Sequence, residues 1–532
     1  MKKYTLAVFL FLFLRSVSDF SQEPFTVSVV PIQFNNFPGL HSFAFAQQNG
    51  LWVFIGGRTN GLHHFEPPFA FMTNAINNNI YVVNPLTQQI WSAPATSLPV
   101  DTKEAITSTN MEFVQRDSIL YMIGGYGWSS ALSDFKTFPT LTAINLNSLT
   151  NAVISSSSIN NSFRQIIDTT MAITGGNGMM IDSTVYLVFG HKFDGRYNRV
   201  DSLITTIQKY SNQVRAFNIW DDGTNLTIAN YQATTDTVNF HRRDFNLVPQ
   251  IFPDRASGAT AFSGVFQYNI DLPYLNSVDL KPGNYAVNNN FNQNLSQYSS
   301  AVMPVYDSTH NYMHSVFFGG ISMYYPDTIT QIMTTDSLVP FVNTISKVTR
   351  APDSTMTEYA LPIRMPAFLG ANSLFIPDTS IAHYSGEVIN LNHLSGLTRV
   401  GWIVGGILSP DRNIADNDPG VSIASTEVFE VYIDKNVTSN QGVMMKNNIM
   451  NFIAYPNPGN QINIQFETDK DAIIEIIDIH GRTVEGSVVK KDTGIRTLLR
   501  YTTSTLTPGI YFCRVKIGDE SKTMKLMIAG NH

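Results

Sequence analysis

Short apolar runs that end in glycine recur along the chain. Four of them close on a Gly-Gly doublet, namely Leu51–Gly57, Ile119–Gly125, His314–Gly320 and Gly401–Gly406. Thr184–Gly190 is a degenerate copy with Phe189 in place of the first glycine. The first doublet positions, 56, 124, 189, 319 and 405, are 68, 65, 130 and 86 residues apart, and 130 is twice 65. A sixth copy is therefore expected inside that gap, where Ala261–Tyr268 fits the pattern.

Each repeat is expected to hold about four antiparallel strands. After the first doublet, Ile80–Trp91 reads as a strand, a turn at Asn84-Pro85 and a second strand. Runs that begin at Leu141, Val214 and Glu427 occupy equivalent places. Because no long segment shows helical periodicity, each repeat is typical of one blade of a β-propeller. A β-sandwich is the alternative, but its strands recur without such a long period.

The doublet Gly56-Gly57, with Tyr81 and Trp91 further on, resembles the kelch repeat. This resemblance implies blades in a closed ring, and we predict an all-β protein with a six-bladed kelch-like β-propeller over residues 23–434. A ring with a seventh, very degenerate blade is the alternative. Residues 435–448 form a polar linker without a strand pattern, so the last blade lacks a fourth strand, whereas Phe25–Pro31 is spare. We expect this spare strand to complete the last blade, which removes an open sheet edge.

The last segment, residues 449–532, alternates short strands and turns and predicts a small immunoglobulin-like β-sandwich. Its motifs, in order, include Tyr455, Pro456, Asn457, Pro458, Gly481, Arg482, Gly509, Tyr511 and Lys525. They resemble the type A C-terminal sorting domain of the type IX secretion system of Bacteroidota. The resemblance implies the translocon and sorting machinery as partners, and a domain that is usually removed from a released or surface-attached cargo. An ordinary adhesive immunoglobulin-like module is the alternative.

The first residues indicate a signal peptide over residues 1–21. Lys2 and Lys3 precede the apolar run Leu6–Leu14, which is too short to span a membrane, and cleavage fits before Asp19 or after Ser21. A buried N-terminal strand would leave the lysines unexplained. We therefore expect a secreted or cell-surface protein that passes through the periplasm and has no transmembrane segment when mature.

Composition removes several classes of function. With 43% hydrophobic residues a disordered chain is excluded, and a net charge of -7 without a basic cluster argues against a nucleic-acid partner. The single cysteine, Cys513, excludes a disulfide framework and a cysteine metal site. It also lies outside the expected propeller, which removes the tyrosine–cysteine crosslink that the resemblance to kelch copper oxidases would require.

The loops after the doublets carry the candidate ligand-binding residues. They are Arg58, His63, Tyr126, Trp128, His191, Arg196, Tyr324, Asp411 and Arg412. Aromatic faces beside Arg and His suit a glycan or a peptide, although Tyr and Trp in propellers also pack between blades. Residues 411–420 are read as a calcium loop or, more simply, a solvated turn. Recurring Asp-Ser and Asp-Thr pairs resemble O-glycosylation acceptors of Bacteroidota or serve as turn formers.

No catalytic residue, cofactor or metal site is predicted, because no nucleophile elbow, phosphate loop or zinc motif is present in the sequence. The expected function is therefore that of a binding or recognition module for glycans or proteins. A secreted carbohydrate-active enzyme, such as a sugar mutarotase or epimerase, is the alternative and rests on analogy with other kelch rings.

Overall fold

The computed structural model divides the chain into two compact units, residues 1–445 and 446–532. In the first unit it describes residues 24–198, 206–327, 333–413, 421–435 and 443–445. In the second it describes residues 452–455, 462–468, 471–479, 481–489, 497–503, 506–517 and 520–528. The expected signal peptide lies outside these residues.

The described chain is all-β, as predicted. Its α-helices are α1 (Val100–Ile106) and α2 (Leu146–Ile154), both inserted between strands. Neither is long and apolar enough to cross a membrane. Inner strands such as those over Leu51–Ile55 and Tyr312–Phe318 are buried along almost their whole length, because both faces of their sheets pack against other parts of the unit, whereas an outer strand such as Leu226–Thr235 is largely exposed.

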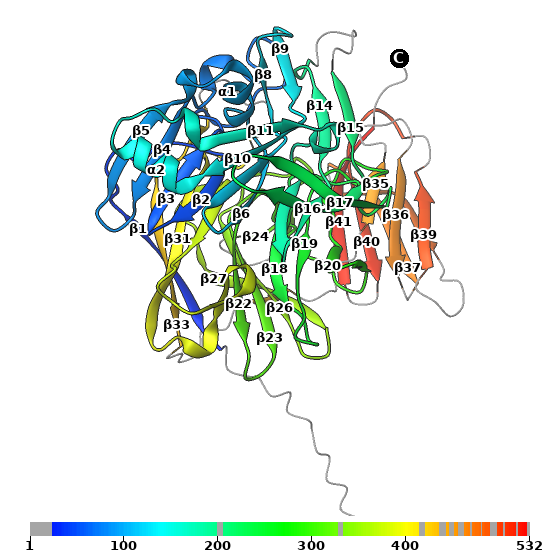
Figure 1. The fold of residues 1–532 in the computed structure, drawn as a ribbon. Coiled ribbons are helices and arrows are strands. Elements are labelled where there is room, and N and C mark those ends of the chain that lie inside the picture. The colour runs from blue at the N-terminus through cyan, green and yellow to red at the C-terminus, as the bar shows by residue number, and fades with distance from the viewer. Residues whose placement is uncertain are drawn as a thin grey trace, which may run out of the picture. The chain divides into compact units, whose positions relative to one another are not determined.

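Six antiparallel groups of four strands follow one another along the first unit (Figure 1). Sheet 1 contains β2 (Ala44–Gln48), β3 (Leu51–Ile55), β4 (Asn79–Asn84) and β5 (Gln89–Pro94). Sheet 2 contains β6 (Glu112–Arg116), β7 (Ile119–Ile123), β10 (Thr140–Asn145) and β11 (Phe163–Ile167). Sheet 3 contains β12 (Asn177–Ile181), β13 (Thr184–Val188), β16 (Gln213–Asp221) and β17 (Leu226–Thr235).

The remaining three sheets repeat this order. Sheet 4 contains β18 (Asn246–Ile251), β19 (Ser257–Phe262), β20 (Ser277–Lys281) and β21 (Asn284–Asn288). Sheet 5 contains β22 (Ala301–Asp307), β23 (Tyr312–Phe318), β26 (Thr344–Arg350) and β27 (Met356–Arg364), with β30 (Val388–Asn390) and β29 (His383–Tyr384) added beside β22. Sheet 6 contains β28 (Phe368–Pro377), β31 (Leu397–Ser409), β33 (Val428–Asp434) and β1 (Thr26–Ile32), with β32 (Ile423–Ala424) beside β31.

The N-terminal strand supplies the fourth strand of sheet 6, which confirms the pairing predicted from the chain ends. β1 runs antiparallel to β33, with Thr26 opposite Asp434 and Ile32 opposite Val428 (Figure 1). The side chains of Phe25 and Val27 are buried in a core shared with sheet 5. The beginning of the chain therefore holds the end of this unit in place.

The predicted linker contains a strand that the sequence pattern did not indicate. Val443–Met445 forms β34 and pairs antiparallel with β27, with Met445 opposite Glu358 and Val443 opposite Ala360. The outer edge of a sheet offers unpaired backbone groups to any extended segment nearby, so this pairing needs no hydrophobic alternation.

All six doublets turn the backbone into the left-handed region. The four Gly-Gly pairs have positive φ at both positions, and so do Phe189-Gly190 and Ser263-Gly264, which lies inside the expected sixth copy. At Gly56 a Cβ atom would lie 2.6 Å from the Ser108 carbonyl oxygen of sheet 2. Glycine is needed there both for its φ of +69° and for this close approach between sheets.

Three of the segments expected to be loops after the doublets are instead two-stranded hairpins. They are β8 (Tyr126–Ser129) with β9 (Asp134–Thr137), β14 (His191–Asp194) with β15 (Ile207–Tyr210), and β24 (Tyr324–Pro326) with β25 (Met333–Thr335). Backbone pairing within each hairpin holds its side chains in position above sheets 2, 3 and 5. The sequence missed these strands because their runs are only three or four residues long.

The second unit has two sheets around one core. One sheet contains β35 (Phe452–Tyr455), β36 (Asn463–Thr468) and β39 (Thr497–Thr502). The other contains β38 (Thr483–Val489), β37 (Ala472–Asp478), β40 (Gly509–Ile517) and β41 (Glu520–Ile528). Ile464 from the first sheet packs with Ile474 and Cys513 from the second, so Cys513 acts as a small core residue.

Candidate functional site

The first strands of all six sheets enclose a central cavity of about 250 Å³. Its lining comes from residues 42–43, 110–111, 113, 175–177, 244–247, 299–302 and 372–375. Polar side chains such as Asn110, Asp244 and Asn372 share the lining with apolar ones such as Phe113 and Phe375. The cavity therefore offers both hydrogen-bonding groups and apolar surface to an occupant.

A chain of backbone hydrogen bonds runs around this cavity. Its members, here called the rim residues, are Ser42, Asn110, Gly175, Asp244, Ser299 and Asn372, all with positive φ. Five hydrogen bonds join these six residues in chain order: the N–H of each rim residue after Ser42 donates to the carbonyl oxygen of the one before it, from Asn110 to Ser42 (3.1 Å) through to Asn372 to Ser299 (2.5 Å). Asn, Asp and Gly tolerate left-handed backbone best, which explains four of the six residue types.

Arg243 and Asp244 place a charged pair at the rim in sheet 4. The Arg243 Nη1 lies 3.1 Å from Asp244 Oδ2, and Nη2 donates to the Tyr197 hydroxyl at 3.3 Å. Burial acts to lower the pKa of Arg243, but this pKa stays above its ordinary value because of the nearby Tyr197, Asp244 and Tyr210. The guanidinium therefore stays charged. A Cβ atom on Gly175 would lie 3.2 Å from Asp244 Oδ1, so glycine leaves room for this carboxylate.

The structure brings six of the sequence candidates together above sheets 1 to 3. Tyr126 is only 3% exposed, and its hydroxyl donates to the Gly195 carbonyl oxygen at 2.5 Å. Arg58 is equally buried and donates to the Met72 carbonyl oxygen at 2.8 Å. Both side chains therefore support neighbouring loops. His63 is half-buried and its ring stacks on Phe71 at 4.3 Å between centroids.

The other three candidates of this group border the same aromatic cluster. Trp128 is half-buried against Phe135, and Arg196 lies over the Phe135 ring at 5.9 Å and 3.6 Å from Asp134. His191 is 4% exposed, and its Nδ1 lies 2.8 Å from Gln208 Nε2. Burial lowers the pKa of His191 well below its ordinary value, with a smaller effect from the Arg243 cation, so its ring is neutral.

Tyr324, Asp411 and Arg412 lie apart from that cluster, beside sheets 5 and 6. Tyr324 is 6% exposed, and burial raises its pKa to about 12. Asp411 is exposed, and its carbonyl oxygen accepts a hydrogen bond from the Ser409 hydroxyl at 2.5 Å. The Arg412 guanidinium lies 4.1 Å from the centre of the Tyr325 ring. The sequence candidates therefore form two groups.

Sequence reasoning missed Arg243, Asp244 and Tyr210. The search followed the loops after the doublets, whereas Arg243 and Asp244 precede the first strand of sheet 4, whose doublet is the most degenerate. Alignment of the residues around the start of each first strand would have found Asp244 and its neighbour Arg243, because a rim residue with left-handed backbone recurs there; in sheet 6 this residue is Asn372, inside β28. Tyr210 lies on β15, a strand that the sequence pattern did not indicate.

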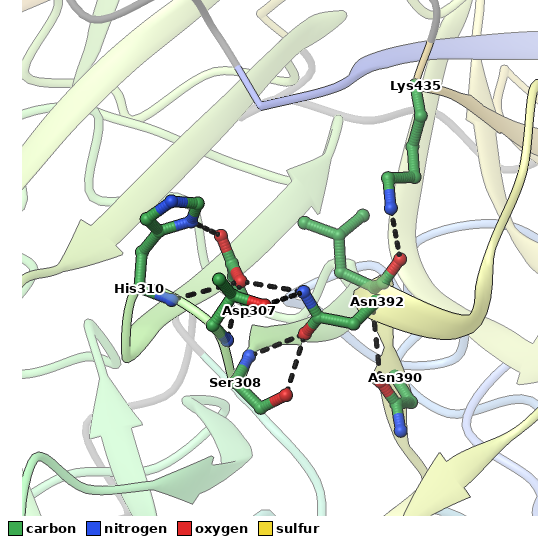
Figure 2. A network of polar contacts seen from close by, with 8 residues as sticks. Asp307, Ser308, His310, Asn390, Asn392 and Lys435 are labelled. Carbon is green, nitrogen blue, oxygen red and sulfur yellow. Dashed lines mark hydrogen bonds and ion pairs between the residues drawn. The ribbon is translucent and has the colours of Figure 1, made fainter.

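A polar network near the β22–β23 turn has the residue types of a hydrolytic triad but a different geometry (Figure 2). Asp307 Oδ2 lies 2.7 Å from His310 Nδ1, whereas the Ser308 hydroxyl donates to Asn392 Oδ1 at 2.8 Å. Asn392 Nδ2 in turn donates to Asp307 Oδ1 at 3.0 Å. The network thus fastens the turn to residues 390–393, and it engages the hydroxyl of Ser308, one of the possible glycosylation sites.

No group of three or more His, Cys, Asp or Glu is placed to hold a metal ion in the described part of the chain. Of the possible calcium loop at 411–420, residues 414–420 lie outside the described residues.

Residues 453–529 match the family described as the secretion system C-terminal sorting domain. The chain carries a type IX secretion sorting domain. This domain implies an interaction with the type IX secretion machinery and export to the cell surface or beyond it. Within it, Arg482 Nε donates to Asp478 Oδ2 at 2.8 Å beside Gly481, which has a φ of +81°.

The other sorting-domain motifs are described in part. Gly509 begins β40. Two residues further on, the Tyr511 hydroxyl donates to the Thr507 carbonyl oxygen at 3.0 Å. Lys525 pairs through its backbone with Phe512. Tyr455 ends β35, whereas Pro456, Asn457 and Pro458 lie outside the described residues.

The comparisons add little about the first unit. No curated protein matches this chain. A solved structure titled "Structure of YjhT" is similar at a TM-score of 0.43 and 10% sequence identity, over 77% of this chain and 98% of that one.

Proposed function

We propose that the first unit is a six-bladed kelch-like propeller that binds one terminal group of a glycan or protein at its central cavity, outside the cell. The observation that carries this proposal is the convergence of all six sheets on one cavity through the bonded rim residues. A cavity lined by every sheet is what a closed ring produces, and rings use the channel mouth for binding.

The size of the cavity limits what can enter. About 250 Å³ is below the range of about 300–1,000 Å³ typical of pockets that enclose a whole drug-sized ligand. It suits a single sugar ring or one amino-acid side chain. Asp244 would accept hydrogen bonds from hydroxyl or amino groups, while the Phe113 and Phe375 side chains offer apolar surface to the ring carbons.

A glycan and peptide array that records turnover as well as binding tests this function. Arg243→Gln removes the cation beside Asp244 and is expected to weaken binding at least tenfold. Arg255→Gln is the matched control, since Arg255 is an exposed arginine on sheet 4. Binding without product supports the recognition module, whereas product formation supports the mutarotase or epimerase alternative. Full binding by Arg243→Gln would contradict binding through Asp244, the lining residue with which Arg243 forms an ion pair.

The second unit is proposed to be an immunoglobulin-like sandwich of the type A class that directs the chain from the periplasm through the outer membrane of a Bacteroidota cell. Its family match and its shared two-sheet core support this role. Removal of residues 449–532 should leave the protein in the periplasm. Undiminished appearance in the medium or on the surface would refute the sorting role.

A further inference from the structure

Arg412 lies in an aromatic clamp beside sheets 5 and 6. Its guanidinium carbon is 4.1 Å from the centre of the Tyr325 ring and 4.8 Å from that of Phe368. The Phe341 N–H donates to the Arg412 carbonyl oxygen at 2.9 Å, which fixes the backbone of the arginine. The guanidinium therefore lies against two aromatic rings, which restrict its orientation, while Arg412 as a whole is only half-buried.

The donors of Arg412 are not used up by the protein. Its Nη1 is buried and has no hydrogen-bond partner. No carboxylate of the described residues forms an ion pair with this guanidinium; the nearby Asp336 instead accepts from the Asn413 side chain at 2.9 Å. A buried, charged donor without an acceptor costs free energy, so the site favours a group that would satisfy it.

A second uncompensated cation lies close by. Arg364 ends β27 and uses Nη1 to donate to the Leu361 carbonyl oxygen at 2.7 Å, and no ion pair joins it to the described residues. Arg364 pairs with Thr344 at the start of β26, and Phe341, just before β26, donates its N–H to the Arg412 carbonyl oxygen, so both arginines flank the residues that enter this strand. Burial lowers the pKa of Arg364, and the like charge of Arg412 lowers it further, because the two guanidiniums repel each other. An anion between them would relieve this repulsion.

The site lies at the same end of the sheets as the doublets. Tyr325 belongs to the hairpin that follows the doublet Gly319-Gly320, and the Gly320 N–H donates to the carbonyl oxygen of Leu369, next to Phe368, at 3.4 Å. An extended ligand bound at this end of the unit would therefore reach it without crossing the molecule.

We propose that Arg364 and Arg412 form an oxyanion-binding site for a carboxylate, sulfate or phosphate group. Forked N–H donors match these groups in pairs, and the Tyr325 ring keeps the Arg412 fork in a fixed plane. The site shares no residue with the central cavity, so its occupancy does not depend on the function proposed above. It would make the protein selective for acidic ligands.

Calorimetric titration of the full secreted chain with D-glucuronate, sulfate, phosphate and D-glucose, at constant ionic strength in chloride, tests the site. We expect at least one of the three anions to bind. D-Glucose, which lacks the carboxylate, should bind more weakly than D-glucuronate. The strongest of the three anions identifies a uronate, a sulfate ester or a phosphate as the natural group. Binding should weaken as sodium chloride is raised, because salt screens the attraction between the anion and the two half-buried arginines and chloride competes for the site.

Arg412→Gln and Arg364→Gln are each expected to weaken anion binding about tenfold or more, while Arg255→Gln leaves it unchanged. Arg364 makes no ring contact comparable to those of Arg412 and donates to a carbonyl oxygen of its own strand, so its variant keeps the test valid if Arg412→Gln does not fold. Anion binding that is the same in both variants and the wild type would overturn the proposal, and so would the absence of binding by all three anions. Loss of glycan binding in Arg243→Gln with intact anion binding would separate the two sites.

Discussion

The strand that closes the first unit offers the most direct test of the fold. Phe25 lies just before β1, is 3% exposed and belongs to the core that sheets 5 and 6 share. Its ring meets the His314 ring edge-on at 5.3 Å, and the Lys347 ammonium lies 5.4 Å from its centre. Phe25→Ala therefore removes contacts between the N-terminal segment of sheet 6 and the neighbouring sheet 5, and not only within one sheet.

The expected cost follows from these contacts. Truncation of a buried phenylalanine to alanine destabilises a core by about 3–5 kcal/mol. Native domains are stable by only about 5–15 kcal/mol, so the variant loses a large part of its stability. Val30 is the matched control, because its side chain on β1 is 43% exposed and Val30→Ala should change stability by no more than about 0.5 kcal/mol.

Urea unfolding followed by tryptophan fluorescence measures both variants. All five tryptophans of the chain lie between residues 52 and 402, so the signal reports on the first unit alone. Trp52 of sheet 1 and Trp402 of sheet 6 pack at 5.2 Å and report directly on the seam between the ends. Equal midpoints for Phe25→Ala and Val30→Ala would refute the reasoning, as would a chain lacking residues 23–32 that folds with normal stability.

Three further predictions follow from local geometry. Gly56→Ala should lower the free energy of unfolding in urea by more than about 2 kcal/mol, because its Cβ would lie 2.6 Å from a carbonyl oxygen. The control Gly50→Ala has a similar φ and nothing within 4 Å, so it should lower this free energy by about 1 kcal/mol. Equal losses in the two variants would contradict the prediction. Burial acts to raise the pKa of Asp307, but hydrogen bonds from Asn392 and His310 hold this pKa below its ordinary value. The wild type should therefore lose stability as the pH falls below about 4 and the carboxylate is protonated. Asn392→Asp instead sets two carboxylates together and should be about 1–3 kcal/mol less stable at pH 7 than at pH 4, relative to Asn392→Ala at the same pH values; a parallel pH profile would disprove the network. Burial raises the pKa of the Cys513 thiol to about 12, so a thiol reagent at pH 8 should label it only after unfolding, and rapid labelling of the native chain would contradict its burial.

Much of the fold could be predicted because its signals are local. A few alternating residues are enough to recognise a strand. A glycine doublet indicates a left-handed turn, because other residues adopt that backbone conformation only at a cost in free energy. Even the copies at Phe189 and Ser263 keep the positive φ of the doublet, so spacing was a better guide than residue identity. The pairing of β1 with β33 followed from counting unpaired strands at the two ends.

Local signals fail where a contact depends on distant parts of the chain. The three-residue strand β34 is too short to have a pattern, and its existence depends on the free edge of β27. Tyr126 and His191 were selected as loop residues that could meet a ligand, but the β8–β9 and β14–β15 hairpins bury them. Their burial is set by Gly195 and Gln208, which lie far along the chain or on a strand that was not predicted.

The sequence by itself determined the repeat, the strand content, the strand exchange between the chain ends and the type IX sorting domain, because each is encoded in short motifs or in their spacing. Only the tertiary structure decided where chemistry can occur. The rim residues are up to 330 positions apart, and Arg243 with Tyr197 or Arg412 with Tyr325 meet only when distant segments pack together. Convergence of side chains depends on how sheets are arranged around the cavity, and that arrangement is not a property of any single segment.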